Sequence, residues 1–298
     1  MATQAATTPA ATTAGRTRTR KAPSGRPKTP WWMWLGVIAI LVFCLFPFYW
    51  LINISLKAGN DLQSSSLIPP NPTLDNYSSI FKNPDFTKAL RNSAVVALST
   101  TVLALVVGSF CAYALARLKL KGKFVILAIV LTISTFPQIA IAAPLFKLWS
   151  DIGIFNTWIG LILPYLTFAL PLTIYILVSF FREIPRDLEE AALVDGATHF
   201  QAFRKVVIPL AAPGLATAGI LAFIASWNEF LLAVTLTSSS RARTVPAAIA
   251  FFTGATEHEV PYGSISAASV VISVPLILLV LLFQKRIVAG LTAGAVKG

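Results

Sequence analysis

The side chains that could do chemistry are few in this sequence, and most of them lie inside or beside long apolar runs. Glu229 is the one carboxylate within such a run, and it follows Trp227 and Asn228 directly. An ionisable group at membrane depth indicates a functional site, and aromatic and amide side chains suit a polar ligand such as a sugar. Because Glu229 stands close to the end of its run, a structural or interfacial role is an equal alternative.

Other polar side chains occur within the apolar runs. Gln138 lies near Ser134 in one run, and Ser266, Ser269 and Ser273 share one helical face of another. The residues that we predict to line a translocation pathway are Gln138, Trp227, Asn228, Glu229, Ser269 and Ser273.

The sequence lacks the motifs that would make it an enzyme. It has no G-x-x-x-x-G-K-[ST] loop, no H-E-x-x-H helix and no G-x-S-x-G turn. His199 and His258 are the only histidines, and Cys44 and Cys111 both fall inside apolar runs. We therefore expect no catalytic residues, no metal site, no disulfide framework and no cofactor in this chain.

The composition is that of a polytopic membrane protein. Of 298 residues 56% are hydrophobic and only 12% are charged, and the mean hydropathy is +0.73, whereas about 25% of residues are charged in soluble domains. A hydrocarbon core about 30 Å thick requires about 20 apolar residues per helix. We predict an all-α integral membrane protein with six transmembrane helices, near residues 33–54, 89–116, 124–147, 159–181, 213–236 and 265–283.

The positive charges predict the orientation of these helices. The net charge of +12 is gathered in short blocks beside apolar runs, so we expect no nucleic-acid partner. Seventeen of the 24 Lys and Arg residues fall in the segments of one side and seven in those of the other. The positive-inside rule then predicts a multi-pass protein of the bacterial inner or plasma membrane with both termini in the cytoplasm.

Three segments make up the predicted domain organisation. Residues 1–30 are rich in Ala, Thr and basic side chains and predict a disordered cytoplasmic tail. Residues 31–288 would form the transmembrane domain, whose first span is uncleaved, and residues 289–298 would form a cytoplasmic C-terminal tail.

Small residues and prolines indicate how the spans pack. Ala104, Gly108, Ala112 and Ala116 recur at intervals of four, as do Gly214, Ala218, Ala222 and Ser226. Such faces let helix backbones approach closely, either within the chain or at a subunit interface. Prolines are predicted to interrupt the third, fourth and sixth runs, at Pro137, Pro144, Pro164, Pro171 and Pro275. Interrupted helices free backbone groups that a water-filled pathway could satisfy.

A polar stretch from Glu189 to Gly214 interrupts the apolar pattern and reads as helix, turn, helix. We predict Asp187 as the N-cap of the first helix and Gly196 as the left-handed residue that ends it. Thr198 and Gln201 form a T-x-x-Q capping box for the second helix.

The two helices of this stretch have different side chains. The first carries the small residues Ala191 and Ala192, where another surface could approach closely. The second carries Phe200, Phe203 and Val207 in a stripe that predicts packing.

The stretch resembles the EAA loop of the permease subunits of binding-protein-dependent ABC importers, whose pattern is E-A-A, then D-G-A, then a hydrophobic residue and Pro. The matching residues are Glu190, Ala191, Ala192, Asp195, Gly196, Ala197, Ile208 and Pro209. The resemblance implies an ABC importer type I permease fold. It also implies that the loop, about residues 186–212, is the coupling element whose first helix docks in a cleft of a cytoplasmic ATPase.

From about residue 31 onward the chain is similar to the second, maltose-type permease of carbohydrate importers, above all of the actinobacterial trehalose type. The segments that carry this similarity are LIPPNPTLDNYSSIF, FPQIAIAAPLF, FFREIPRDLEEAALVDGA, SWNEFLLA and VAGLTAGAVKG. It implies import of a sugar, such as the disaccharide trehalose, by ATP-driven alternating access. The implied partners are a second homologous permease, two ATPase copies that bind Mg-ATP, an extracytoplasmic sugar-binding protein or lipoprotein, and membrane lipid.

The same similarity implies two further contacts. The long segment 237–264 would reach the binding protein through the residues Ala250, Phe251, Phe252, Thr253 and Gly254, although a small interfacial helix is the alternative. The C-terminal tail would insert between the ATPases.

Two other functions stay open. One is an ABC permease for another solute: maltose or another oligosaccharide, glycerol phosphate, an amino acid, a peptide or a polyamine. The other is an ion-coupled secondary carrier, which would need charged groups near the middle of the bilayer, where the sequence offers only Glu229. An intramembrane enzyme would need a nucleophile and base or a metal set, which the sequence does not offer.

Overall fold

The computed structural model describes residues 30–57, 59–252 and 261–293, and within these ranges it forms helices and connecting segments without a strand. The chain divides into two compact units, Met1–Phe46 and Pro47–Gly298. In the first unit, the described residues form the first part of helix α1 (Trp31–Ser55). Its apolar run is long enough to cross a membrane, as predicted.

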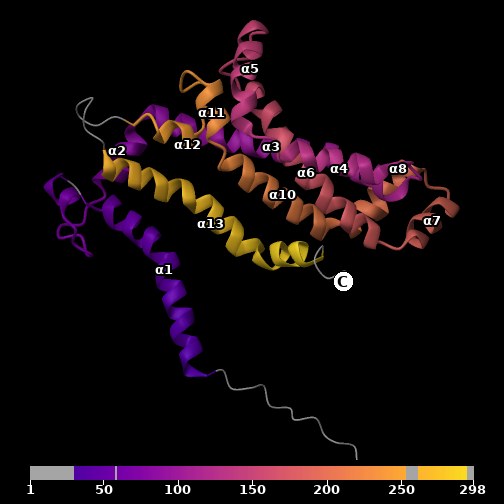
Figure 1. The fold of residues 1–298 in the computed structure, drawn as a ribbon, viewed down its shortest axis with the longest axis horizontal. Coiled ribbons are helices and arrows are strands. Elements are labelled where there is room, and N and C mark those ends of the chain that lie inside the picture. Colours follow the sequence, from indigo (N-terminus) through magenta and orange to yellow (C-terminus); the bar gives the residue numbers. More distant parts are fainter. Residues whose placement is uncertain (1–29, 58, 253–260, 294–298) are drawn as a thin grey trace, which may run out of the picture. The chain divides into compact units, whose positions relative to one another are not determined.

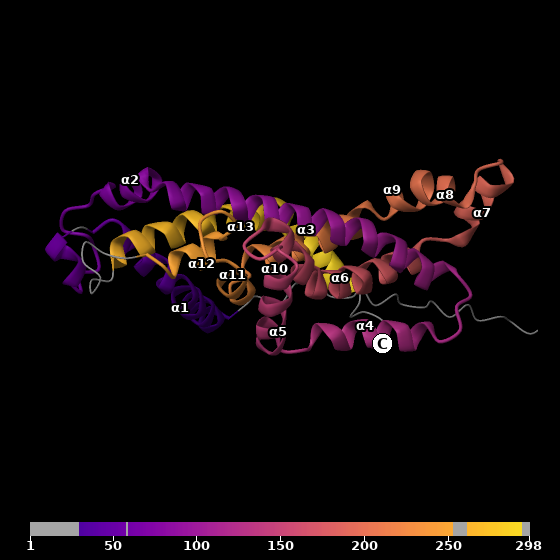
Figure 2. The ribbon, with the colours of Figure 1, turned by 90° about the horizontal axis from the view of Figure 1, so that it is seen from above.

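Three long helices form the centre of the second unit. α3 (Pro84–Arg117) packs along α6 (Trp158–Glu183), and α10 (Ala212–Trp227) packs against both of them (Figures 1 and 2). α13 (Tyr262–Ala293) packs beside α10.

The predicted small-residue faces lie at the contacts among these helices. Ala104, Ala112 and Ala116 are buried. A Cβ atom on Gly108 would lie 2.7 Å from Thr173 Cγ2 of α6, and one on Gly214 would overlap the ring of Phe180. Both small-residue faces therefore pack within the chain, which is the first of the two alternatives, packing within the chain or at a subunit interface, that the sequence left open.

Two of the predicted spans are broken rather than continuous. α4 (Lys123–Ser134) and α5 (Gln138–Asp151) meet at an angle of 82°. The break lies at Thr135–Pro137, as the sequence indicated, because proline lacks an N–H and restricts the residue before it. The predicted interruptions at the other four prolines are wrong, because Pro144, Pro164, Pro171 and Pro275 lie inside continuous helices.

The prediction of one continuous fifth span at 213–236 is wrong. α10 ends at Trp227, and a separate helix, α11 (Leu231–Leu236), follows. At its other end α10 makes an angle of 76° with the segment His199–Leu210. Four described helices are each long and apolar enough to cross a membrane, and there are up to six spans when each bent pair is counted as one.

The last helix is longer than the predicted span. The sequence placed the span at 265–283 and a tail from residue 289, whereas α13 continues to Ala293. Residues 294–298 of the predicted tail, and residues 1–29 of the predicted N-terminal tail, lie outside the described residues.

One end of the second unit contains short helices that pack on the beginning of α3. These are α2 (Asp75–Lys82) and α12 (Val245–Ile249). A further short helix, η1 (Gly59–Gln63), precedes α2 in the chain. α3 begins with Pro84 in its first turn, and the Asn83 side chain accepts the N–H of Asp85 at 2.9 Å. This cap satisfies one of the free N–H groups of the helix start.

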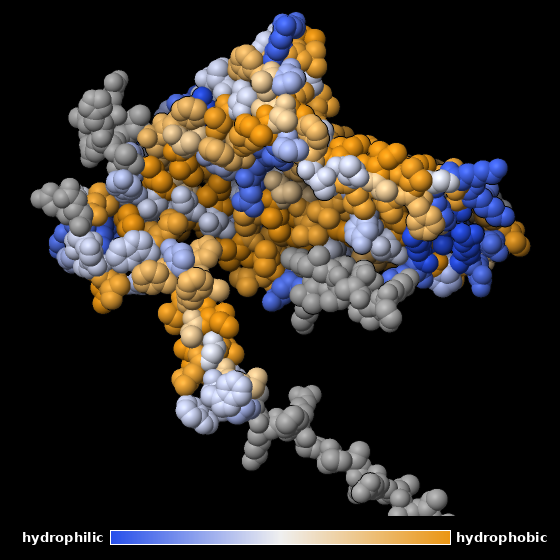
Figure 3. Space-filling view, viewed as in Figure 1, coloured by the Kyte–Doolittle hydropathy of each residue, from blue (hydrophilic) through white to orange (hydrophobic). Residues whose placement is uncertain are grey.

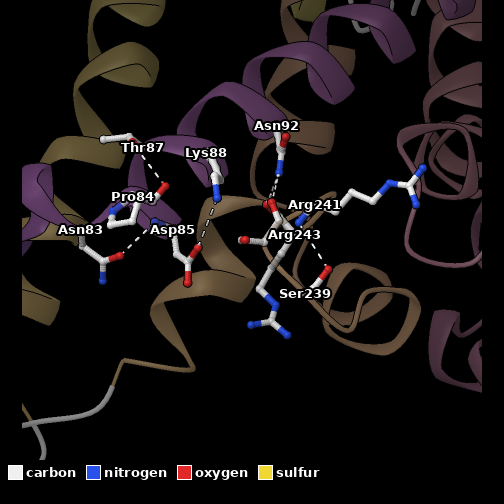
Figure 4. Close-up of polar contacts among 10 residues, drawn as sticks. Asn83, Pro84, Asp85, Thr87, Lys88, Asn92, Ser239, Arg241 and Arg243 are labelled. Carbon is white, nitrogen blue, oxygen red and sulfur yellow. Dashed lines mark hydrogen bonds and ion pairs between the residues drawn. The ribbon is translucent and has the colours of Figure 1, made fainter.

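The segment after α11 is fastened to α3 at this end (Figure 4). The Asn92 side chain donates to the carbonyl oxygens of Ser240 and Arg243, at 3.0 Å each. Trp158 Nε1 donates to Asn92 Oδ1 at 3.0 Å. The N–H of Val245 donates to Ser93 Oγ at 2.8 Å. The polar contacts explain why this segment folds back onto the bundle.

Residues 247–252, in the segment predicted to contact the binding protein, pack on the same end. Ala247 and Ala248 are buried, and the Phe252 ring meets the Phe86 ring edge to face at a centroid distance of 6.0 Å. Phe251 is half exposed and lies against the Arg243 guanidinium. Of the predicted contact residues, Thr253 and Gly254 lie outside the described residues.

The close approach at Gly214 predicts that a single methyl group there destabilises the bundle. Gly214→Ala places a Cβ within the Phe180 ring, so the α6–α10 contact must open, at a cost of about 1–3 kcal/mol. Gly219→Ala on the same helix is the matched control, because its Cβ would meet only the movable tip of Leu105, at 3.1 Å. Thermal unfolding in detergent should show a clearly lower midpoint for Gly214→Ala, and equal midpoints would contradict the packing.

Candidate functional site

The stretch that the sequence singled out folds as a helical hairpin at the end of the bundle opposite α2 and α12 (Figures 1 and 2). Its first arm is α7 (Arg186–Val194). Its second arm contains α8 (His199–Ala202), the π-helical segment η2 (Phe203–Val207) and α9 (Ile208–Leu210). We call the segment Arg186–Leu210 the α7 hairpin.

The turn of the hairpin has the predicted geometry. Gly196 has a φ of 87°, in the left-handed region. Its N–H donates to Leu193 O at 3.1 Å, and the N–H of Ala197 donates to Ala192 O at 3.0 Å. This pair of bonds is a Schellman motif, in which glycine avoids the cost of a side chain at positive φ. The prediction for Gly196 is confirmed.

The two helix starts differ in how well they were predicted. Thr198 Oγ1 accepts the N–H of Gln201 at 3.2 Å, and Gln201 Oε1 accepts the N–H of Thr198 at 2.8 Å, so the predicted capping box is present. The prediction of Asp187 as an N-cap is wrong. α7 already begins at Arg186, after Pro185, because proline fixes φ near the helical value. Asp187 lies in the first turn, where a carboxylate favours the helix dipole.

One face of α7 is exposed and partly apolar. Glu190, Ala191, Asp195 and Gly196 are exposed, and Ala192 and Ala197 are half-buried. Beside them Val194 is 86% exposed, and Leu188 is also exposed. Hydrophilic residues gather at this end of the molecule, whereas the middle of the bundle is hydrophobic (Figure 3). An exposed face with small and branched apolar side chains in polar surroundings suits a protein–protein contact.

The second arm anchors the hairpin to α3. Phe203 and Val207 are buried, and the Phe203 ring lies 4.8 Å from the Tyr113 ring and 5.3 Å from the Phe110 ring, centroid to centroid. Phe200, the first residue of the predicted stripe, stacks on Phe110 but remains 58% exposed. Two residues of the predicted stripe, Phe203 and Val207, are therefore buried by packing, and the third, Phe200, is not.

Sequence reasoning missed the side chain that ties the first arm to the bundle. Glu189 is buried, and its carboxylate lies 3.1 Å from Arg117 Nε and accepts a hydrogen bond from the Tyr113 hydroxyl. Arg117 Nη2 also donates to Ile184 O at 3.0 Å. The only sequence signal was the spacing of Tyr113 and Arg117, which places them on one face of α3.

The predicted pathway residues do not gather at one cavity. Gln138 begins α5 and borders a groove of about 410 Å³ beside the α4–α5 break, the only one of the six to do so. The described residues that line this groove are Ile129, Thr132, Ile133, Ser134, Phe136, Gln138, Ile141, Thr167 and Phe168. The Ser269 and Ser273 hydroxyls donate to carbonyl oxygens one turn earlier in α13.

The Trp227–Glu229 segment has structural contacts at the break between α10 and α11. Trp227 is buried and its Nε1 donates to Ile272 O of α13 at 3.2 Å. The buried Glu229 carboxylate accepts the N–H groups of Leu232 at 2.7 Å and Ala233 at 3.0 Å. Asn228 is exposed, and its side chain donates to Ile224 O. Glu229 therefore caps α11, in agreement with the structural alternative.

Comparison with known proteins identifies the family of the chain. Residues 88–292 match the family described as binding-protein-dependent transport system inner membrane component. The chain is 52% identical over 274 residues to the trehalose transport system permease protein SugB of Mycobacterium tuberculosis (strain CDC 1551 / Oshkosh), covering 92% of this chain and 100% of that protein. It is 42% identical over 266 residues to the trehalose/maltose transport system permease protein MalG of Thermococcus litoralis, covering 89% and 95%.

Among solved structures, a chain of a bacterial ABC transporter involved in the import of the acidic polysaccharide alginate matches with a TM-score of 0.73. The match covers 87% of this chain and 99% of that chain at 23% sequence identity, so it supports the fold. The fold, the hairpin and the family match lead to one conclusion. The chain belongs to the inner-membrane components of binding-protein-dependent transport systems, as a non-catalytic permease subunit of an ABC importer whose ATPase is a separate partner.

Proposed function

We propose that this permease moves a sugar, and specifically a disaccharide such as trehalose, into the cytoplasm by ATP-driven alternating access. Support for the substrate comes from the two full-length relatives described above, whose names give trehalose or trehalose and maltose. The observation that carries the mechanism is the exposed face of the α7 hairpin, with Glu190, Ala191 and Asp195 in solvent and Gly196 at the turn.

In this proposal α7 is the contact with the ATPase. The small residues Ala191 and Ala192 of α7, with Ala197 in the turn that follows, permit close approach, and the exposed Val194 supplies apolar area that a cleft would cover. Two ATPase copies that bind Mg-ATP would draw together this hairpin and that of a second permease. The two permeases would then alternate between inward and outward access.

The opposite end would receive the sugar from an extracytoplasmic binding protein. That end holds α2, α12 and the contact residues Ala250, Phe251 and Phe252, which with Thr253 and Gly254 remain a prediction. The pathway through Gln138 also remains a prediction, and so does the insertion of residues 289–298 between the ATPases. An ion-coupled carrier is less favoured, because the carboxylate of Glu229 is already held by two backbone N–H groups.

The orientation can be tested by labelling single cysteines. In a chain with Cys44 and Cys111 replaced by Ala, we expect Lys121→Cys to react with a membrane-impermeant thiol reagent only after permeabilisation, because its loop belongs to the positively charged side. Ser238→Cys, exposed at the opposite end, should react in intact cells. The reverse pattern would overturn the proposed sidedness.

The substrate can be tested by competition. In cells whose only route for trehalose is this transporter with its cognate subunits, uptake of labelled trehalose should fall when unlabelled trehalose is in excess. Maltose should compete less well and an amino acid or polyamine not at all. If another solute class competes and trehalose does not, the proposed substrate is wrong while the coupling proposal still stands.

The docking face can be tested with changes that leave the fold of the chain intact. Ala191→Asp places a carboxylate at an exposed position, so it costs little in the permease alone, but a partner that covers it would bury an unpaired charge at about 1–3 kcal/mol or more. We expect lost co-purification of the ATPase or lost stimulation of ATP hydrolysis by the sugar-loaded binding protein. Ala191→Ser, small and uncharged, is the matched control and should retain both.

Gly196 offers a second variant of the same test. A Cβ there meets no atom of this chain within 4 Å, so the cost of Gly196→Val in the permease is the backbone strain at positive φ, about 1 kcal/mol or more. Gly196→Asn, which tolerates the left-handed region, should be milder. If Ala191→Asp and Gly196→Val both retain full stimulated hydrolysis and uptake, the α7 hairpin is not the coupling element.

A further inference from the structure

The buried contacts of Glu189 and Arg117 connect two helices and the segment before one of them at one point. Glu189 belongs to the first turn of α7, Arg117 to the last turn of α3, and Ile184, which accepts Arg117 Nη2, to the segment between α6 and α7. The Arg117 and Glu189 side chains are only 7% and 11% exposed. Their attraction is therefore weakly screened by water, and the geometry is fixed by a third group, the Tyr113 hydroxyl.

Glu189 does not lie on the docking face. It is buried towards α3, whereas its neighbour Glu190 in the E-A-A triplet is exposed. The two adjacent carboxylates therefore have different positions: Glu190 is available to a partner, and Glu189 is held by the permease itself. Since a buried charge that loses its partner is strongly unfavourable, α7 cannot move away from α3 without breaking this contact.

α3 extends from this contact to the opposite end of the bundle. Its 34 residues form one helix, about 51 Å long at 1.5 Å per residue. At its far end Asn92 and Ser93 hold the backbone of the segment before and at α12, and Phe86 packs on Phe252. One continuous helix thus joins the α7 hairpin to the region that precedes α13 (Figures 1 and 2).

We propose that Tyr113, Arg117 and Glu189 form a joint that transmits movement of α7 to α3, and through α3 to the α12 end of the permease. The three are positioning residues, which act through α7 and touch neither ATP nor sugar. The inference rests on the proposed docking of α7 on the ATPase. It adds that the first arm moves with α3 because of a buried ion pair, in addition to the apolar packing of Phe203.

The test separates transmission of movement from assembly. Glu189→Gln keeps the size of the side chain and removes its charge, so the ion pair with Arg117 is lost. In the purified complex with its ATPase, reconstituted in lipid, we expect the amount of bound ATPase to be retained. The ratio of hydrolysis stimulated by the sugar-loaded binding protein to basal hydrolysis should fall by about tenfold, a usual size for coupling between sites. Glu183→Gln, an exposed carboxylate at the end of α6, is the matched control and should retain the ratio.

A second variant shows whether the groups act together. Tyr113→Phe removes only the hydroxyl that donates to Glu189, and should lower the ratio less than Glu189→Gln. Because both changes affect one joint, the double variant should be no worse than Glu189→Gln alone. Additive effects, or a Glu189→Gln complex whose ratio stays within about twofold of the native one, would overturn the inference.

Two further outcomes are decided by the same measurements. If Glu189→Gln prevents assembly with the ATPase, the Tyr113→Phe complex tests the joint instead. A lower ratio of stimulated to basal hydrolysis in that complex supports the joint, and an unchanged ratio overturns it. If Ala191→Asp uncouples the ATPase while Glu189→Gln does not, the joint fails and the docking proposal stands. If neither Ala191→Asp nor Glu189→Gln changes the ratio of stimulated to basal hydrolysis, the docking proposal fails as well.

Discussion

The hydrocarbon interior of a membrane offers no hydrogen-bond partner, so a helix that breaks there must satisfy its free backbone groups from within the protein. The break after Trp227 shows one solution. The Glu229 carboxylate accepts two N–H groups at the start of α11, which would otherwise have no hydrogen-bond partner. At the α4–α5 break, Pro137 removes one N–H instead. The positions of the bends in this permease follow from this constraint.

The same constraint explains the close contacts of α3, α6 and α10. Lipid tails are as apolar as the side chains of a helix, so helices associate through close packing rather than through exclusion of water. Gly108 and Gly214 permit that packing, because a Cβ atom on either would collide with α6. The bundle formed in this way holds α3 straight along α6, and α3 in turn supports the α7 hairpin.

The features that the sequence predicted well are local or periodic. The left-handed turn at Gly196 and the Thr198–Gln201 capping box each depend on residues within one turn of the chain, and their residue types are specific. The apolar runs were found because their length is set by the bilayer, although hydropathy alone could not show that the fifth run is two helices. Asp187 was wrongly predicted as the N-cap because both Asp187 and Pro185 are residue types that can mark a helix start. The residue types alone do not show at which of the two the helix begins.

The features that the sequence could not predict depend on distant residues. Nothing in the stretch around Glu189 distinguishes it from Glu190, and only the packing of α7 on α3 places one carboxylate inside and the other outside. The hydrogen bonds of three pathway candidates also depend on distant or neighbouring backbone groups that the sequence does not identify. Trp227, Ser269 and Ser273 are polar residues in apolar runs, but their polar atoms bond to carbonyl oxygens of the bundle.

The amide of Asn92 has a consequence for the chemical durability of the protein. The amide nitrogen of Asn92 donates to two carbonyl oxygens, and its amide oxygen accepts an indole N–H. The three contacts therefore require the nitrogen and the oxygen of the amide to occupy these two positions and not the reverse. Conversion of this one nitrogen to oxygen, the change that spontaneous deamidation makes, would set a carboxylate against two carbonyl dipoles and release the backbone before α12. Two of the hydrogen bonds that attach this backbone to α3 therefore depend on the identity of a single atom, and the bond from the Val245 N–H to Ser93 Oγ would remain.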